Sequence, residues 1–178
     1  MRTDVYALAF RLTSKNMILI GLGSNMIGPW GTPRDTVLRA LRELGGNGTQ
    51  LLAASRLLTT SPYGRKNQPD YVNAVALIAT HMPPEALLRR LHAIERSAGR
   101  RRGIRWGPRS LDLDLLDYHG RRMRQPGPLT LPHPGITLRQ FVLKPIAEVA
   151  PGWIHPVEHQ RARSLLRRLD GHGGGAEI

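Results

Sequence analysis

The sequence predicts an α+β fold, in which helices pack on a mainly antiparallel β-sheet. Its 178 residues suffice for one domain with a real hydrophobic core, and they contain no internal repeat and no Pro/Ser-rich linker. Amphipathic helical segments alternate with short apolar strands, which gives two β-α-β units. The order of these elements leaves one alternative open, a small parallel α/β fold.

The first β-α pair follows directly from hydrophobic pattern and end signals. Residues 17–22 (MILIGL) form a short apolar run that a Gly-Ser-Asn turn ends, so we predict a buried strand there. Residues 32–44 read as a helix that Thr32 can cap, with Pro33 in its first turn and two glycines after its end. The apolar side chains of this helix fall on one face: Val37, Leu38, Leu41 and Leu44.

The middle of the chain repeats this alternation. Residues 50–60 and 71–80 are predicted strands, and residues 61–69 between them are a loop rich in turn-forming residues. A Pro-Pro pair opens a helix over residues 83–98. Its apolar face contains Leu87, Leu88, Leu91 and Ile94.

The C-terminal part contains one clear strand and one clear helix. Residues 99–109 form a basic loop interrupted by glycines, and residues 111–118 are the third clear strand. Residues 125–135 are Pro-rich coil, residues 141–150 mix strand and helix signals, and residues 161–169 form a short amphipathic helix. Together the elements predict a ferredoxin-like α/β sandwich.

We expect a single domain over residues 17–170. Residues 1–16 make a poor signal peptide, because the apolar core at 7–10 is short and Arg11 interrupts it. They are expected to be an extension, either disordered or translated from an upstream start codon. Residues 171–178 are expected to form a flexible tail.

The composition excludes several classes of protein. Without cysteine there can be no disulfide framework, no thiolate chemistry and no zinc site built on cysteine. This fits a reducing compartment, and we expect a cytoplasmic protein. No segment approaches the roughly 18 apolar residues that a membrane span requires.

The formal net charge of +13 favours a polyanionic partner, which could be nucleic acid, a membrane surface or a polyphosphate. Only three of the 26 basic residues are lysine, and the others are arginine. An arginine-rich, lysine-poor chain can also reflect genomic base composition, so the charge alone does not choose a partner.

Acidic and apolar residues alternate through the third strand. Leu111, Leu113 and Leu115 should face the core, which places Asp112 and Asp114 together on the opposite face. Their Cβ atoms would lie roughly 6–7 Å apart, and two carboxylates at this spacing repel unless a cation lies between them. Carboxylate oxygens suit Mg²⁺. The alternative is a half-buried strand with a solvated acidic face.

Five arginines precede this strand: Arg100, Arg101, Arg102, Arg105 and Arg109. Guanidinium groups match phosphate oxygens, so with a metal ion they could clamp a triphosphate. The alternative is an exposed charged loop, and it stays open for Arg101 and Arg102 individually.

Three side chains would suit a flat heteroaromatic ligand. Trp106 lies in a Trp-Gly-Pro turn that is apolar and rigid for a solvated loop, so its indole is placed to cover something flat. Tyr71 and Asn73 share a strand face, where a ring could stack on the ligand and an amide could pair with its edge. The alternative is a core tyrosine with an asparagine in a turn.

Three blocks of sequence resemble the 6-hydroxymethyl-7,8-dihydropterin pyrophosphokinase family. The first is RWGPRSLDLD at 105–114, the second is PYG at 62–64 with NQPDYVNAV at 67–75, and the third is LTLPHP at 129–134 with RQFVL at 139–143. The resemblance covers residues 17–157. It implies transfer of diphosphate from ATP to 6-hydroxymethyl-7,8-dihydropterin in folate biosynthesis, through attack of the hydroxymethyl oxygen on the β-phosphorus with AMP leaving.

The resemblance also implies roles for individual residues. Asp112 and Asp114 would hold two Mg²⁺ ions, and Arg100 and Arg109 would stabilise charge on the transferring group. The pterin site would be bordered by Thr60, Pro62, Tyr63, Tyr71, Asn73, Trp106 and Phe141. The nucleotide would be bound by Glu95, Arg102, Arg105, Thr130, His133 and Arg139. For Glu95 an ion pair with a neighbouring arginine is the alternative.

Two positions depart from the family pattern. Pro128 replaces a residue that is often basic in relatives, and Gly135 replaces one that is commonly bulky or basic. These changes bear on individual ATP contacts rather than on the reaction.

Two rival functions stay open at this point. The charge would fit a basic nucleic-acid-binding module, although the chain has only nine aromatic residues (two Phe, three Trp, four Tyr) and no recognised RNA-binding motif. The Asp pair would also repel a phosphate backbone. The other rival is an inactive paralogue, against which the intact set of Arg and Asp residues argues. We expect a monomer that binds two small-molecule substrates, without nucleic acid or membrane partners.

Overall fold

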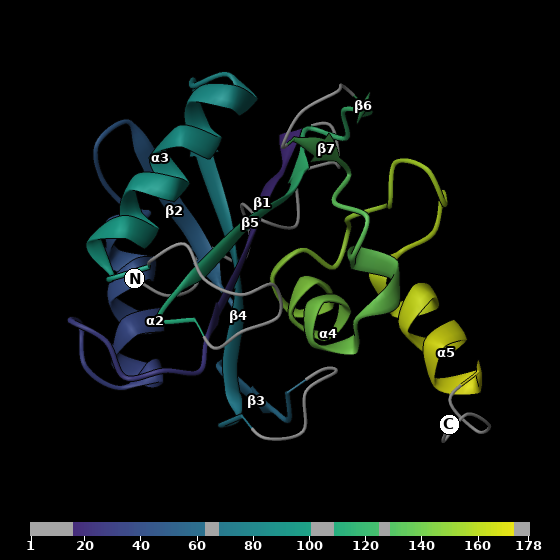
Figure 1. Cartoon of the computed structure of the whole chain (residues 1–178). Coiled ribbons are helices and arrows are strands. Elements are labelled where there is room, and N and C mark those ends of the chain that lie inside the picture. The colour runs from purple at the N-terminus through teal and green to yellow at the C-terminus, as the bar shows by residue number, and fades with distance from the viewer. Residues whose placement is uncertain (1–15, 63–67, 101–108, 125–128, 173–178) are drawn as a thin grey trace, which may run out of the picture.

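The computed structural model describes residues 16–62, 68–100, 109–124 and 129–172 (Figure 1). Five strands form one sheet: β1 (Ile18–Ser24), β2 (Thr49–Ala54), β3 (Leu58–Thr60), β4 (Tyr71–Thr80) and β5 (Asp112–Tyr118). The helices are α2 (Pro33–Glu43), α3 (Pro84–Ser97), α4 (Gln140–Val149) and α5 (Ala162–His172). Strands β6 (Met123–Arg124) and β7 (Thr130–Leu131) form a small second sheet, and η2 (Ile136–Leu138) is one 3₁₀ turn.

The main sheet has the strand order β2-β4-β1-β5, with β3 also paired to β4. Each of these pairs is antiparallel. Consequently β1 and β2 run in the same direction with β4 between them, and β4 and β5 do so with β1 between them. Two interleaved β-α-β units of this kind are the ferredoxin-like arrangement. The predicted α+β class is therefore confirmed, and the parallel alternative is excluded.

Helices cover both faces of the sheet (Figure 1). Helices α2 and α3 bury their apolar stripes against one face, where Ile18 and Ile20 of β1 point. Helix α4 packs on the other face, with α5 packed against α4, and Leu19 points into this second core. The alternation along β1 is what the pleat of a strand buried on both faces requires.

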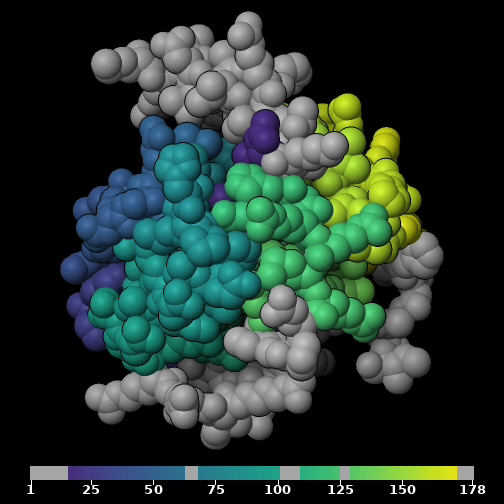
Figure 2. Space-filling view, turned by 90° about the horizontal axis from the view of Figure 1, so that it is seen from above, coloured from purple at the N-terminus to yellow at the C-terminus, as the bar shows by residue number. Residues whose placement is uncertain are grey.

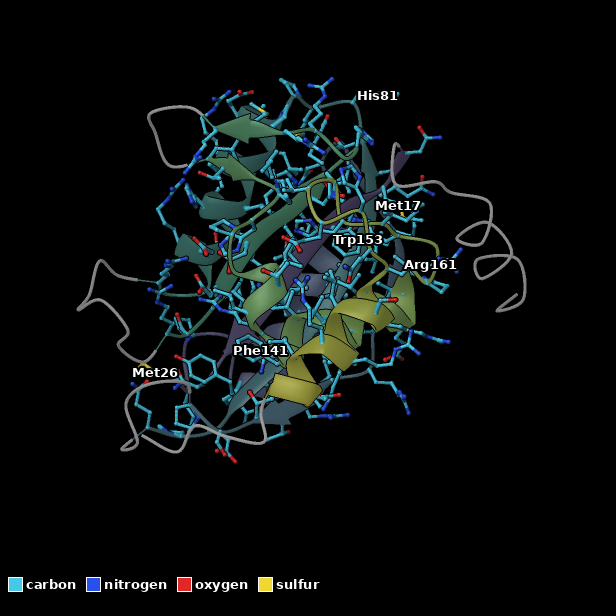
Figure 3. The ribbon with its side chains drawn as sticks, turned by 90° about the vertical axis from the view of Figure 1, so that its right-hand side faces the viewer. Met17, Met26, His81, Phe141, Trp153 and Arg161 are labelled. Atoms are coloured by element: carbon cyan, nitrogen blue, oxygen red, sulfur yellow. The ribbon has the colours of Figure 1, made fainter. Side chains whose placement is uncertain are left out.

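The space-filling view shows the same division from above. The blue and teal residues of the N-terminal half gather on one side, and the green and yellow residues of the C-terminal part gather on the other (Figure 2). Trp153 lies in the interior of the second layer near Met17 (Figure 3), and both side chains are fully buried. Its indole N–H donates to the buried carboxyl of Asp117 over 2.6 Å.

Helix α2 begins where the sequence predicts, because its N-terminus has a complete capping box. The Thr32 hydroxyl accepts from the Asp35 amide at 3.2 Å, and the Thr32 amide donates to the Asp35 carboxylate at 3.1 Å. Pro33 occupies the first turn, where no intrahelical N–H is needed.

The predicted strand at 50–60 is divided into β2 and β3. Between Ala54 and Leu58 the chain advances four residues, while the paired strand advances three, from Ala76 to Asn73. Ser55 still faces Val75, because its amide donates to the Val75 carbonyl at 2.9 Å, so the extra residue lies between Ser55 and Leu58. The Ser55 hydroxyl also accepts from the Val75 amide at 3.0 Å. A serine hydroxyl that takes a ladder hydrogen bond in this way interrupts regular pairing.

Other boundaries also differ from the sequence-based ones. The segment with mixed signals is helix α4, and the Pro-rich coil contains β7 in its described part, with η2 directly after it. Helix α5 extends to His172, so the first two residues of the expected tail are helical. Residues 1–15 of the expected extension (1–16) and residues 173–178 of the tail lie outside the described residues. Among the described residues, no helix has the length and apolarity that a membrane span requires.

Candidate active site

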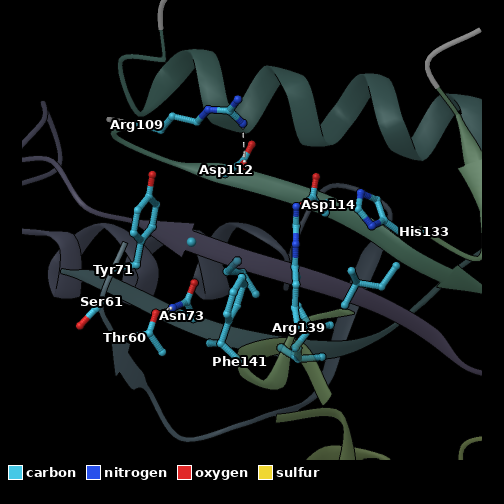
Figure 4. Close-up of a pocket in the computed structure, with 17 residues that line it drawn as sticks. Thr60, Ser61, Tyr71, Asn73, Arg109, Asp112, Asp114, His133, Arg139 and Phe141 are labelled. Carbon is cyan, nitrogen blue, oxygen red and sulfur yellow. Dashed lines mark hydrogen bonds and ion pairs between the residues drawn. The ribbon is translucent and has the colours of Figure 1, made fainter. Parts of the chain in front are cut away.

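A cavity of about 350 Å³ opens on the α4 side of the sheet (Figure 4). Strands β1, β3, β4 and β5 contribute its floor and two of its walls, and the segment from His133 to Val142 closes the third side. Residues from sequence positions 21 to 142 therefore meet at one place.

Strand β5 directs two of its three carboxylates into this cavity, as the alternating pattern predicts. Leu113 and Leu115 are buried in the core beneath α2 and α3, whereas Asp112 and Asp114 line the cavity. Burial raises the pKa of Asp114, and the nearby Asp112 charge raises it further. The positive charges of His133, Arg139 and Arg109 oppose this rise in pKa.

Two glycines of β1 form the floor between β5 and β4. Gly21 pairs with Asp114, and Gly23 pairs with Asp112 on one side and Asn73 on the other. A Cβ atom on Gly23 would lie 3.3 Å from the Asn73 side-chain oxygen, which is a tight contact. The absence of side chains here leaves a flat surface on which a planar ligand can lie. These glycines are not among the site residues predicted from the sequence, although a Gly-x-Gly pattern inside an apolar strand could have indicated them.

The cavity wall opposite β5 is formed by β3 and β4, and it presents neutral polar groups. The Asn73 amide nitrogen donates to the Thr60 hydroxyl at 2.8 Å, which turns its carbonyl oxygen towards Gly23. Tyr71 stands beside them on β4 (Figure 4). Burial is the main cause that raises the pKa of Tyr71 above its usual 10, so its hydroxyl stays protonated at neutral pH.

Arginines hold both oxygens of Asp112. Arg100 Nη1 lies 2.7 Å from Oδ1, and Arg109 Nη1 lies 2.8 Å from Oδ2. Arg100 also forms an ion pair with Glu95. This ion pair with a neighbouring arginine is the alternative role that the sequence left open for Glu95. Glu95 does not line the cavity.

Glu95 of α3 instead lies beside β5, the strand at the edge of the main sheet. It is 2% exposed, and its carboxylate accepts from the Leu113 amide at 2.8 Å, an N–H that no strand partner takes. Burial raises the pKa of Glu95 to about 7, although the hydrogen bond from Leu113 and the charge of Arg100 act in the opposite direction. Burial is therefore the larger effect on this carboxyl group.

The third side of the cavity carries His133, Arg139 and Phe141. The Gly135 amide donates to Nδ1 of His133 at 3.0 Å, so a neutral ring carries its proton on Nε2. A Cβ atom on Gly135 would lie 3.0 Å from the His133 ring and 3.1 Å from the Arg139 guanidinium carbon. Glycine at position 135 therefore leaves room for both groups.

The structure brings most of the predicted site residues together. Those that line the cavity are Thr60, Tyr71, Asn73, Arg109, Asp112, Asp114, His133, Arg139 and Phe141. Arg100 touches Asp112 from outside, while Pro62 and Thr130 are not part of the lining. Tyr63, Arg102, Arg105, Trp106 and Pro128 lie outside the described residues. Lining residues that the sequence analysis did not select include Gly21, Gly23, Ser61, Leu116 and Val142.

Sequence comparison connects this chain to known enzymes. Residues 19–151 match the family described as 7,8-dihydro-6-hydroxymethylpterin-pyrophosphokinase. A 2-amino-4-hydroxy-6-hydroxymethyldihydropteridine pyrophosphokinase of Haemophilus influenzae is 41% identical over 154 residues, which are 86% of this chain and 92% of the relative. The enzyme of the same name from Synechocystis sp. is 39% identical over 153 residues, which are 85% of this chain and 75% of the relative.

A solved structure supports the fold independently. The crystal structure of the HPPK-DHPS protein of Plasmodium falciparum superposes with a TM-score of 0.60 at 13% sequence identity. The match covers 86% of this chain and 43% of the Plasmodium chain. With the sequence match over more than half of its length, this chain belongs to the 7,8-dihydro-6-hydroxymethylpterin-pyrophosphokinase family.

Proposed function

We propose that this protein transfers diphosphate from ATP to 6-hydroxymethyl-7,8-dihydropterin, giving AMP and the pterin diphosphate, in folate biosynthesis. The observation that carries the proposal is the pair Asp112 and Asp114, which faces a flat-floored cavity and is flanked by arginines in a chain of this family.

The pterin would lie over the glycine floor, near Tyr71 and Phe141. Aromatic rings favour stacking on a heteroaromatic ligand, and the side chains of Asn73 and Thr60 can pair with the polar edge of the ring. Such pairing discriminates well, because a wrong ligand would leave buried polar groups without partners. Pro62, Tyr63 and Trp106 stay predicted members of the same site.

The nucleotide would place its phosphates near Arg109, Arg139 and His133. Guanidinium groups bind phosphate oxygens in a bidentate manner, and Arg139 points towards Asp114 (Figure 4). Arg102, Arg105 and Thr130 stay predicted nucleotide contacts. Glu95 would help to bind the nucleotide through Arg100 and not by direct contact.

The carboxylates fit Mg²⁺. Their oxygens are hard ligands. Burial and then the charge of Asp112 raise the pKa of Asp114, and a cation would relieve the repulsion between the two carboxylates. Within the described part of the chain, no group of three or more His, Asp or Glu side chains is placed to hold a metal ion. Water and substrate phosphates would therefore complete the coordination, and a total of two ions is our prediction. Mg²⁺ bound there would screen the charge between carboxylates and phosphates.

The chain's own contribution to the reaction would be alignment and charge stabilisation. The hydroxymethyl oxygen forms a bond to the β-phosphorus, the bond from that phosphorus to the α,β-bridging oxygen breaks, and AMP leaves with the electron pair. The hydroxyl proton passes to water. Arg100 and Arg109, which contact Asp112 here, would stabilise charge on the transferring group.

An AMP-release assay tests the proposal directly. The purified protein would be mixed with ATP, Mg²⁺ and 6-hydroxymethyl-7,8-dihydropterin, and AMP would be quantified by chromatography. We expect AMP in equal amount to the pterin diphosphate, and none without the pterin. ATP hydrolysis to ADP, or no AMP with all three components, would contradict the proposal. The cytoplasmic location and the monomeric state are further predictions.

A further inference from the structure

Asn25, the residue directly after β1, is bound to Arg109 through both its backbone and its side chain. Its amide N–H donates to the Arg109 carbonyl at 3.2 Å, and its side-chain oxygen accepts from the Arg109 amide at 2.9 Å. Asn25 is 1% exposed. These two bonds hold the backbone of Arg109, whose guanidinium contacts Asp112.

The other half of the Asn25 amide bonds to the segment that leads into β4. Its nitrogen Nδ2 donates to the Pro69 carbonyl at 3.2 Å and to the Gln68 side-chain oxygen at 3.3 Å. Pro69 lies two residues before Tyr71, the first residue of β4. One side chain therefore joins the start of the Tyr71 and Asn73 wall to the backbone that carries Arg109.

Backbone groups determine the orientation of this amide. The Arg109 N–H can only donate, so it must face Oδ1, and the Pro69 carbonyl can only accept, so it must face Nδ2. Alanine supplies neither group. A carboxylate would keep the acceptor for Arg109 but turn an oxygen towards the Pro69 carbonyl. The position therefore requires a donor and an acceptor on one short side chain.

We propose that Asn25 is a positioning residue for diphosphate transfer, because it sets the spacing between the phosphate-binding side of the cavity at Arg109 and the ring-binding side at Tyr71 and Asn73. The inference rests on the proposed function. Asn25 itself does not line the cavity, so it would act through these neighbours and not by contact with either substrate. A change in this spacing would disturb the alignment of the hydroxymethyl oxygen with the β-phosphorus.

The test compares Asn25→Ala with a matched control, Thr80→Ala. Thr80 lies at the other end of β4, where its hydroxyl likewise links two segments: it donates to the Gly48 carbonyl at 2.6 Å and accepts from the Met82 amide at 3.1 Å. For both variants and the wild type, kcat, the KM of each substrate and the melting temperature would be measured in the AMP-release assay and by circular dichroism.

We expect Asn25→Ala to lower kcat by about 10- to 100-fold, the size of effect that a small misplacement of reacting groups produces, with smaller changes in the two KM values. Thr80→Ala also removes hydrogen bonds, so it should lower the melting temperature, but it should leave kcat unchanged. A kcat for Asn25→Ala within about twofold of the wild type would overturn the inference, and so would an equal loss of kcat in Thr80→Ala.

Asn25→Asp provides the second measurement if the alanine variant does not fold. It preserves shape and the Arg109 acceptor while removing the donor to Pro69, and we expect kcat to fall at least about tenfold with native circular dichroism. Wild-type kcat in this variant would overturn the inference. Loss of the fold in both Asn25 variants would assign the residue to stability alone and overturn it as well. Absence of AMP release by the wild type would instead count against the proposed function.

Discussion

Replacing Glu95 by glutamine should remove a pH-dependent loss of stability that this buried carboxyl group causes. Glutamine retains an oxygen that can accept the 2.8 Å hydrogen bond from the Leu113 amide, and it cannot ionise. In the wild type, burial raises the pKa of Glu95 from its usual 4.5 to about 7. The two proteins should therefore differ in how their stability changes with pH.

The direction in which stability changes with pH follows from the pH at which the folded and the unfolded chain each release the Glu95 proton. Below the unfolded-state pKa, both states carry the proton and ionisation costs nothing. As the pH rises, the unfolded chain releases the proton first, so the free energy of unfolding falls until the pH passes the folded-state pKa of about 7. Between the usual pKa of 4.5 and the folded-state pKa of about 7, each pH unit costs about 1.4 kcal/mol, so the free energy of unfolding falls by about 3 kcal/mol in all.

Urea unfolding of both proteins from about pH 5 to about pH 8 measures this difference. Asp117, whose pKa burial raises to about 6, titrates in both proteins, so the comparison with the variant isolates Glu95. We expect the wild type to lose about 2.5 kcal/mol relative to the variant over this range, because the unfolded chain has already begun to release its proton at about pH 5. Parallel curves would refute the argument that burial outweighs the Arg100 ion pair and the Leu113 hydrogen bond.

Three further outcomes are expected. Asp112→Ala should abolish AMP release while circular dichroism and the melting temperature stay native, and unchanged activity would remove Asp112 from the metal site. Gly23→Ala places a methyl group 3.3 Å from the Asn73 oxygen. Overpacking costs about 1–3 kcal/mol, so calorimetry should show pterin binding weakened by roughly tenfold or more. The affinity for a non-hydrolysable ATP analogue should not change. Equal weakening of both ligands would contradict this view of the floor. Thr32→Ala removes the cap of α2 and should lower the free energy of unfolding by about 1 kcal/mol without altering kcat, as urea unfolding and the AMP assay would show.

Local pattern predicted the elements that carry strong periodic signals. The alternation from Leu111 to Leu115 correctly placed Asp112 and Asp114 on one face, because side chains of a strand alternate whatever the strand pairs with. Thr32 and Pro33 likewise marked the start of α2, since a cap satisfies amide groups only three residues away.

Residues whose role depends on a distant partner were harder to predict. The interruption after Ser55 involves two hydrogen bonds between Ser55 and Val75, which follows it by 20 residues. Glu95 could be predicted to have an arginine partner, but its position against the Leu113 amide depends on β5 being an edge strand. In the sequence, Gly21 and Gly23 lie at the end of an apolar run. Only their pairing with Asp114 and Asp112 places them on the cavity floor.

By itself the sequence determined the helices and strands with clear periodicity, the shared face of Asp112 and Asp114, and, through its resemblance to known enzymes, the family. Only the tertiary structure decided which of those faces meet. The cavity joins β1, β4, β5 and the start of α4, and Asn25 connects its walls through partners 43 to 84 residues away. Side-chain periodicity is a property of a few consecutive residues, whereas strand order and register depend on the packing of the whole chain.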